Sequence, residues 1–255
     1  MHERIRERLK EIEKEHHIKI LYAVESGSRA WGFASKDSDY DIRFIYVHHL
    51  HWYLRIFPER DVIEYPIDKQ LLDISGWDLK KTLGLLSKSN PVLYEWLQSP
   101  IVYYEDSAFL KDLQNLATHF FRPTSTLHHY LHMAENNYKE YLQGDMVKIK
   151  KYFYVLRPVL TCLWIEKYNS PPPMLFEELV KNIIKDTSLM NVISILLERK
   201  RRGDELSLEP SIPEINAFLD QSIIHIKDLI STLPEDRKDK GDLLDEFFLR
   251  WVMKA

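Results

Sequence analysis

The chain has 255 residues, of which 45% are hydrophobic and 29% are charged, and its formal net charge is −4 at pH 7. This is ordinary globular composition for one or two domains, and it excludes intrinsic disorder, a collagen-like repeat and a disulfide scaffold. The single cysteine, Cys162, has no internal disulfide partner, so we expect a cytoplasmic protein. We expect neither a secretory signal, because the N-terminal segment is charged, nor a membrane span.

The N-terminal part of the chain alternates helical and strand patterns. Apolar residues at helical spacing predict an amphipathic helix over residues 2–17, and a β-branched, apolar run predicts a strand over 18–24. A Gly-Ser turn leads to a short predicted helix at 29–33, and period-two alternation predicts a second strand over 39–47. Further predicted elements are a short helix near Trp52, a strand at 62–65, an apolar strand-like segment at 71–74 and a helix from Trp77 to Asn90.

Beyond about residue 107 the patterns are almost entirely helical. The predicted helices span 109–121, 127–142, 146–168, 176–186, 189–202, 213–233 and 243–253. We therefore predict an α+β fold. A small mixed sheet with flanking helices would occupy residues 1–106, and an all-helical domain would occupy residues 107–255.

The polar stretch from Glu25 to Ile42 carries the strongest chemical signal. Gly27 allows the backbone to approach a ligand closely, and the amides at a helix start form an anion site with the Ser28 hydroxyl. Alternation along the second strand places Asp39 and Asp41 side by side. Two close carboxylates repel each other unless a cation lies between them, and Mg²⁺ accepts carboxylates together with phosphate oxygens. An anion cradle beside a cation site is what nucleotidyl transfer from a triphosphate requires.

This stretch resembles the signature of the DNA polymerase β-like nucleotidyltransferase superfamily, in which Gly-Ser is followed after a spacer by Asp-x-Asp with apolar neighbours. Here the spacer has ten residues. The segments Ser26–Gly32, Asp73–Leu79 and Asn90–Pro91 further resemble a branch described as a predicted RNA-repair or RNA-ligase-associated nucleotidyltransferase group. The likeness is strong over Glu25–Pro91 and looser in the helical half, where Lys151–Pro158 carries it.

The resemblance implies a role for each matching residue. Gly27 and Ser28 would hold the β- and γ-phosphates of an NTP, and Asp39 and Asp41 would ligate the metal ions, Mg²⁺ or alternatively Mn²⁺. It also implies a helical domain that closes the active-site cleft, and it points to an RNA end as the acceptor.

The third carboxylate of such a site lies on a later strand. Asp73 matches best, because apolar strand residues surround it. Asp78 is the competitor, although its place before a predicted helix favours an N-terminal capping role. Asp68 is a weaker candidate. We therefore assign Asp73 as the third catalytic and metal-binding carboxylate.

A basic and aromatic stripe marks the predicted helix over 146–168. Lys150, Tyr154 and Arg157 share one face of it, and Lys151 lies beside them. Such a stripe suits phosphate contact with base stacking, and the alternative is a solvated face. Lys151, Tyr154 and Arg157 are therefore candidate nucleotide-binding residues. Arg29 is another, with an ion pair to Glu25 as its alternative.

The sequence leaves the acceptor open. The first hypothesis is a metal-dependent enzyme that transfers an NMP from an NTP to an acceptor hydroxyl on RNA. The alternatives are transfer to a protein or small-molecule hydroxyl, and a non-catalytic nucleotide-binding or antitoxin-like regulator. The mutually repelling Asp39 and Asp41 argue against the regulator, because a pure binder does not need them. Nothing in the sequence indicates the NTP preference or the oligomeric state.

Overall fold

The computed structural model describes residues 1–57, 59–203, 208–234 and 241–254. The contacts divide the chain into two compact units, and each is described by itself. The sheet unit comprises residues 1–30, 39–121 and the C-terminal helix α12 (Gly241–Val252). The helical unit comprises residues 31–38 and the described residues from 122 to 234. This division does not follow the predicted boundary after residue 106, and the assignment of separate domains on either side of it stays a prediction.

The sheet unit contains a five-stranded mixed sheet with the strand order β3-β4-β2-β1-β5. β2 and β4 are parallel, and the other neighbouring pairs are antiparallel. The elements before α12 are α1 (His2–His16), β1 (Ile18–Glu25), α2 (Gly27–Ala30), β2 (Tyr40–His48), α3 (Leu50–Tyr53), β3 (Val62–Tyr65), β4 (Leu72–Asp78), α4 (Leu79–Ser87), α5 (Pro91–Trp96), β5 (Val102–Glu105) and α6 (Ser107–Thr118).

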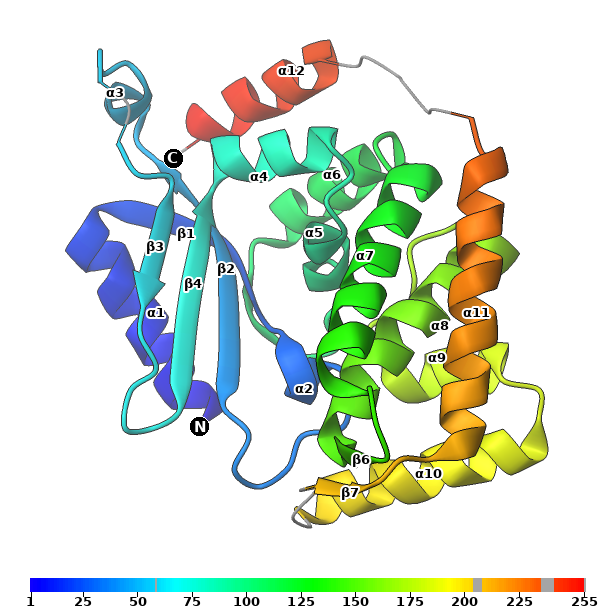
Figure 1. The fold of residues 1–255 in the computed structure, drawn as a ribbon. Coiled ribbons are helices and arrows are strands. Elements are labelled where there is room, and N and C mark those ends of the chain that lie inside the picture. Colours follow the sequence, from blue (N-terminus) through cyan, green and yellow to red (C-terminus); the bar gives the residue numbers. More distant parts are fainter. Residues whose placement is uncertain (58, 204–207, 235–240, 255) are drawn as a thin grey trace. The chain divides into compact units, whose positions relative to one another are not determined.

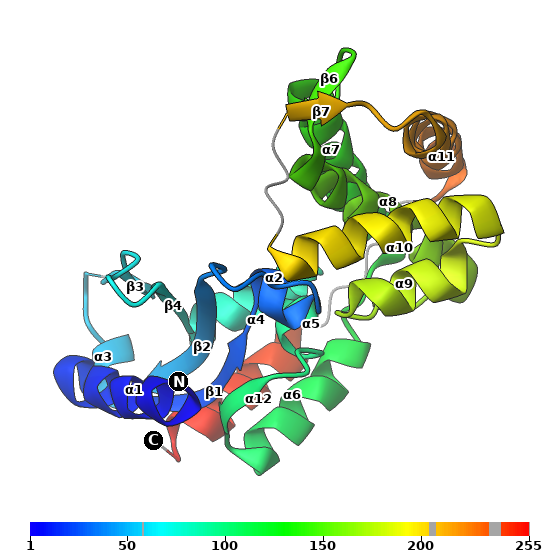
Figure 2. The same ribbon diagram turned by 90° about the horizontal axis from the view of Figure 1, so that it is seen from below.

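Helices cover both faces of this sheet (Figures 1 and 2). Helix α1 packs Ile5, Leu9 and Ile12 against one face, in a core that includes Ile42 and Phe44 of β2. The opposite face is covered by α4, α5, α6 and α12. The inner strand β1 is therefore almost entirely buried, which explains its nearly continuous apolar sequence.

The helical unit consists of packed helices and one small two-stranded sheet. Its most buried element is α8, which packs against α7, α9 and α11. The elements are α7 (Pro123–Tyr141), β6 (Met146–Lys148), the 3₁₀ turn η1 (Ile149–Lys151), α8 (Tyr152–Tyr168), α9 (Phe176–Ile183), α10 (Thr187–Arg202), β7 (Leu208–Pro210) and α11 (Pro213–Thr232).

The predicted α+β class is confirmed, and some elements differ from their predicted form. The helix predicted from residue 146 begins at Tyr152, because Met146–Lys148 pairs with Leu208–Pro210 as an antiparallel ladder. The C-terminal half is therefore not entirely helical. The segment predicted at 71–74 continues as a strand to Asp78, and the helix predicted from Trp77 begins at Leu79.

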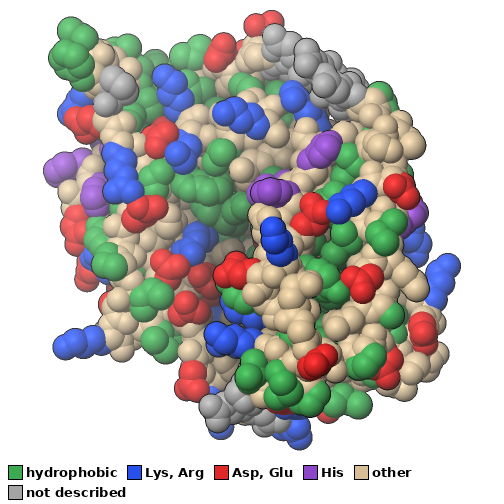
Figure 3. All heavy atoms as spheres, in the orientation of Figure 1, with side chains coloured by type: hydrophobic (Ala, Val, Ile, Leu, Met, Phe, Trp, Pro, Cys, Tyr) green, Lys and Arg blue, Asp and Glu red, His purple; other side chains and the backbone are tan. Residues whose placement is uncertain are grey.

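The corner after α3 is apolar and exposed. Leu54, Ile56 and Phe57 are largely open to solvent, and Figure 3 shows their hydrophobic side chains as a protrusion over the α3 corner. This corner lies at the far end of β2 from the polar stretch that the sequence singles out, since α3 follows the last residues of that strand.

Candidate active site

The turn between β1 and α2 is built around Gly27. Its φ of 57° lies in the left-handed region, which favours glycine. A Cβ atom at this position would lie 1.9 Å from the carboxylate oxygen Oδ2 of Asp41. The amide of Ser26 also donates to the carbonyl oxygen of Asp41 at 2.8 Å. The Gly-Ser turn and the first predicted metal ligands are thus in direct contact. The helix α2 begins at Gly27, earlier than the predicted helix at 29–33.

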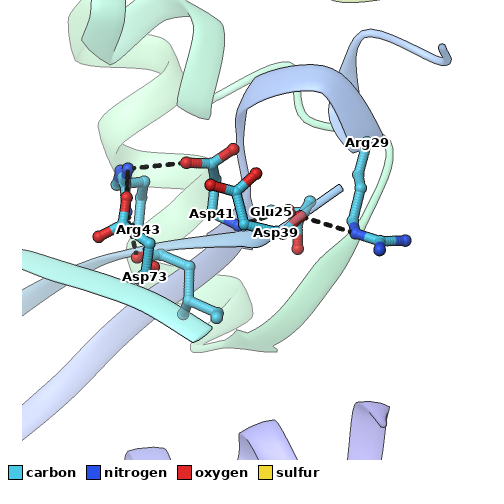
Figure 4. Close-up of polar contacts among 7 residues, drawn as sticks. Glu25, Arg29, Asp39, Asp41, Arg43 and Asp73 are labelled. Atoms are coloured by element: carbon cyan, nitrogen blue, oxygen red, sulfur yellow. Dashed lines mark hydrogen bonds and ion pairs between the residues drawn. The ribbon is translucent and has the colours of Figure 1, made fainter. Parts of the chain in front are cut away.

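Asp41 and Asp73 are brought together by the parallel pairing of β2 and β4, in which they are register partners. One guanidinium contacts both carboxylates (Figure 4). Nη2 of Arg43 lies 3.0 Å from Asp41 Oδ1 and 2.7 Å from Asp73 Oδ2. Nη1 of Arg43 donates to the carbonyl oxygens of Ile42 at 3.1 Å and of Asp73 at 3.0 Å. Arg43 therefore links two of the three predicted metal ligands.

Asp39 immediately precedes β2, and Arg29 contacts its main chain. Nε of Arg29 donates to the carbonyl oxygen of Asp39 at 2.8 Å, and the Arg29 guanidinium lies 3.7 Å from the centre of the Tyr40 ring. These contacts place Arg29 beside the predicted metal ligands (Figure 4). Its predicted contact with a triphosphate stays a prediction.

The carboxyl of Asp41 lies in an environment that disfavours its charge. Burial is the main cause and raises its pKa to about 6. The negative charges of Asp39 and Asp73 add to this rise, and the positive charge of Arg43 opposes it. Near pH 7 the site therefore holds negative charge at a cost, which a bound cation would relieve.

Glu25 supports Asp41 from the end of β1 and was not predicted as a site residue. Its side chain is fully buried. Oε1 accepts a hydrogen bond from the amide of Asp41 at 2.7 Å, and Oε2 accepts one from the Tyr103 hydroxyl. Burial raises the pKa of Glu25 to about 7. An acidic residue that closes an otherwise apolar strand is the signal that could have identified it.

The donor chemistry of the site fits a divalent cation. The carboxylates of Asp39, Asp41 and Asp73 offer the hard oxygen ligands that Mg²⁺ and Mn²⁺ accept. One positively charged nitrogen atom already contacts both Asp41 and Asp73, so a single cation can serve the two. Within the described ranges, no three His, Cys, Asp or Glu side chains are arranged as a preformed metal site. A cation would therefore need the carboxylates and Arg43 to rearrange.

The two competing aspartates have structural contacts. Asp78 caps α4 through a hydrogen bond of 2.7 Å from the Lys80 amide, as predicted, and it accepts another of 2.7 Å from the Tyr53 hydroxyl. It is fully buried at the far end of β4 from Asp73. The Asp68 carboxylate accepts hydrogen bonds from the amides of Gln70 and Leu72 in the turn before β4. These contacts favour Asp73 as the third carboxylate, and the assignment itself stays a prediction.

The candidate nucleotide-binding residues of the helical unit do not share one surface. Nζ of Lys151 lies over the rings of Tyr141 at 3.8 Å and Tyr154 at 4.8 Å, and Tyr154 is 47% exposed. Arg157 is only 4% exposed, and its guanidinium lies 4.5 Å from the centre of the Trp31 ring. Lys151 and Tyr154 are therefore accessible to a ligand. Arg157 is a buried packing residue in this structure, and the predicted phosphate contact of all three stays a prediction.

The loop that separates Gly-Ser from Asp-x-Asp is packed into the helical unit. Phe33 stacks on Phe153 at 4.9 Å between ring centroids and meets Phe176 edge to face. The carbonyl oxygen of Gly32 accepts two hydrogen bonds from Arg201, at 3.0 and 2.6 Å. The spacer of the motif is therefore anchored at Gly32 and Phe33.

None of the helices in the described ranges is long and apolar enough to cross a membrane. A relative in Bacillus subtilis (strain 168), the uncharacterized protein YcgL, is 52% identical over 252 residues, which cover 99% of this chain and 96% of that protein. A crystal structure of a nucleotidyltransferase-like protein from Exiguobacterium sibiricum 255-15 matches with a TM-score of 0.32 and 12% identity, over 98% of this chain and 80% of that one.

A family model described as the RNA repair pathway DNA polymerase beta family matches residues 1–250. The match covers the Gly-Ser turn, the Asp-x-Asp strand and the helical half together, so it agrees with the resemblance drawn from Glu25–Pro91 and extends it. By this match, the chain belongs to the RNA repair pathway DNA polymerase beta family.

Proposed function

We propose that this protein is a metal-dependent nucleotidyltransferase that moves an NMP from an NTP to a hydroxyl at an RNA end and releases pyrophosphate. The observation that carries the proposal is the contact of Gly27 with Asp41, which is itself paired across the sheet with Asp73. A close-approach glycine and paired carboxylates are the parts that a phosphate cradle and a cation site need. Membership of an RNA repair family supports RNA as the acceptor.

The NTP would lie on the β1 side of β2, where Gly27 and Ser28 begin α2. The missing side chain of Gly27 leaves room for the Asp41 carboxylate beside the turn, and the Ser28 hydroxyl can donate to phosphate oxygens. Asp39, Asp41 and Asp73 would hold the divalent cations, which neutralise charge on the triphosphate and lower the pKa of the acceptor hydroxyl. Lys151 and Tyr154 are the accessible candidates for contact with the phosphates and the base.

The acceptor would approach from the opposite side, across β4 and β3. A cavity of about 580 Å³ opens there beside Asp73, and Arg60, Glu64 and Ser75 also line it. In phosphoryl transfer the attacking and leaving oxygens lie roughly in line, so the acceptor must enter opposite the pyrophosphate. Asp73 would then accept the proton of the acceptor hydroxyl. That oxygen bonds to the α-phosphorus, and the bond from the α-phosphorus to the bridging oxygen breaks.

Incubation with each of the four NTPs, labelled on the α-phosphate, tests this proposal. The reactions would contain Mg²⁺ or Mn²⁺ and one acceptor pool: RNA, DNA, protein or small molecules. We expect label on RNA and release of unlabelled pyrophosphate. Label on protein or on small molecules would mean that the acceptor is of that class and is not RNA. Absence of label from every pool, with nucleotide bound, would favour the non-catalytic regulator.

A further inference from the structure

Arg43 joins the two strands that carry Asp41 and Asp73 at the candidate site. Its guanidinium donates hydrogen bonds to two carboxylates and two main-chain carbonyls. Its side chain is 19% exposed, so the ion pairs are partly screened from water. The proposed reaction gives this arginine no role, although it holds the oxygens of two proposed metal ligands.

Arg43 brings a positive charge to the two carboxylates. A guanidinium stays protonated throughout the range in which proteins are folded, and it carries no acceptor atom. A divalent cation that binds Asp41 and Asp73 would then share those oxygens with a second, permanent cation. Two cations on one pair of carboxylates repel each other, strongly so where water is partly excluded.

Because the guanidinium is planar and rigid, Arg43 cannot leave the carboxylates without also disturbing its contacts with the carbonyls. Nη2 binds Asp41 and Asp73, while Nη1 binds the carbonyl oxygens of Ile42 and Asp73 on the same rigid group. Moving Nη2 away from the carboxylates therefore also disturbs the contacts of Nη1. Metal binding must compensate for all of these contacts.

We propose that Arg43 is a resident counter-ion that competes with the divalent cation for Asp41 and Asp73, and so lowers the affinity of the free protein for metal. The proposal rests on the proposed function, because that function supplies the metal site. Arg43 holds the carboxylates together when the metal is absent and moves off them when it binds. The free protein consequently binds metal weakly, and a cation that arrives with an NTP brings phosphate ligands that offset the competition.

Calorimetric titration with Mn²⁺, without nucleotide, tests this competition. The variants are Arg43→Gln, Arg43→Lys and Arg250→Gln, the last a control because Arg250 is an exposed arginine that pairs with Asp112 at 3.2 Å. We expect Arg43→Gln to bind Mn²⁺ about fivefold more tightly or better, as a removed coupling of ordinary size would give. Arg43→Lys keeps the charge without the fork and should fall between wild type and Arg43→Gln. Arg250→Gln should match wild type.

Thermal melting gives the second readout. Without metal, Arg43→Gln should melt below wild type, because Asp41 and Asp73 lose their counter-ion, and saturating Mn²⁺ should raise its Tm by more than it raises that of wild type. A purely structural arginine would lower the Tm equally with and without Mn²⁺ and leave the affinity unchanged. That result would overturn the proposal. If Arg43→Gln does not fold, Arg43→Lys decides, and an affinity equal to or weaker than that of wild type would overturn it.

The two proposals fail in different ways. If neither wild type nor Arg43→Gln binds Mn²⁺, even with a non-hydrolysable NTP present, the metal site of the proposed function is wrong, and the competition falls with it. If wild type binds Mn²⁺, Asp41→Asn abolishes binding and Arg43→Gln gives no gain, the metal site stands and only the role of Arg43 is overturned.

Discussion

Asp41 and Asp73 are register partners on adjacent parallel strands, and one atom of Arg43 touches both of their carboxylates. The two residues come from chain segments that are separated by α3 and β3. Because β2 and β4 run in the same direction, their first residues meet at one edge of the sheet, where β1 ends and Gly27 begins α2. The sheet topology thus brings the Gly27 turn, Asp41 and Asp73 together at one place.

Asp41→Asn is expected to reduce nucleotidyl transfer to the background rate while the protein stays folded. The variant loses a metal ligand, but it also removes one of several mutually repelling, partly buried charges, so the Tm should hold or rise slightly. Transfer of labelled NMP and a thermal melt by circular dichroism measure the two effects. Wild-type turnover by purified Asp41→Asn would overturn the metal-site assignment.

Asp73→Asn and Asp78→Asn should separate activity from stability. Asp73→Asn should lower turnover by orders of magnitude with little change in Tm, because Asp73 is a half-buried site residue. Asp78→Asn should keep most of the activity and lose about 1 kcal/mol of unfolding free energy, because asparagine still caps α4 but replaces the oxygen that accepts from the Tyr53 hydroxyl. Turnover and urea unfolding of both variants test this, and the opposite ranking would move the catalytic role to Asp78.

Gly27→Ala and Gly84→Ala form a matched pair. At Gly27 the new methyl group would overlap Asp41 at a positive φ, so we expect a loss of at least about 1–2 kcal/mol from the left-handed backbone alone, together with a loss of transfer. Gly84 lies inside α4 with open space around it, and Gly84→Ala should gain about 0.5–1 kcal/mol with normal transfer. Urea unfolding measures both. Equal stability of the two variants would contradict the described turn.

Glu25→Gln should reduce the pH dependence of stability. The pKa of Glu25 is raised to about 7 in the folded protein, so below pH 4.5 it is protonated in both states and costs nothing. Between pH 4.5 and 7 the unfolded chain loses the proton first, and the wild type therefore loses stability as the pH rises. Glutamine keeps an acceptor for the Asp41 amide and does not titrate. Relative to Glu25→Gln, wild type should lose up to about 3 kcal/mol between pH 4 and 8. An equal difference in unfolding free energy between wild type and Glu25→Gln at pH 4 and at pH 8 would refute this.

Lys151→Ala and Arg157→Ala should have different effects. Lys151 lies between two tyrosine rings at an accessible position, and its loss should raise the Kd for a non-hydrolysable NTP about threefold or more. Arg157 is buried against Trp31, so Arg157→Ala should cost about 2 kcal/mol of unfolding free energy through lost packing and cation–π contact. Calorimetry and urea unfolding check these outcomes. An unchanged Kd in Lys151→Ala would show that Lys151 belongs to a solvated face and does not contact the nucleotide.

The local parts of the site were predictable, because they depend on short-range geometry. Gly27, Asp39 and Asp41 lie within one turn–loop–strand segment, where spacing and alternation specify neighbours. The cap at Asp78 follows from its place before a helix, and the structure confirms it. Family membership was also recognisable from this segment, and the family match confirms it.

The parts that depend on distant segments were not predictable. Alternation along β2 puts Arg43 on the same strand face as Asp41, but its bridge to Asp73 exists only because β2 pairs with β4. The spacing of Tyr154 and Arg157 puts them near one face of a helix, yet it does not say which part of that face other helices cover. The strand at Met146–Lys148 forms through its pairing with β7, which overrides the local helical pattern.

The sheet unit is discontinuous in sequence, and this has a consequence for how the chain is synthesised. Phe247 and Trp251 of α12 are buried in the same core as Phe109 and Leu113 of α6. The ribosome makes the larger part of the helical unit, from residue 122 onward, between these two helices. The core on that face of the sheet can therefore form completely only after α12 has been made. Until then, its apolar surface is exposed to solvent. A fragment that stops after α6 would keep every predicted metal ligand and would still expose this surface, so we expect it to aggregate where the full chain does not.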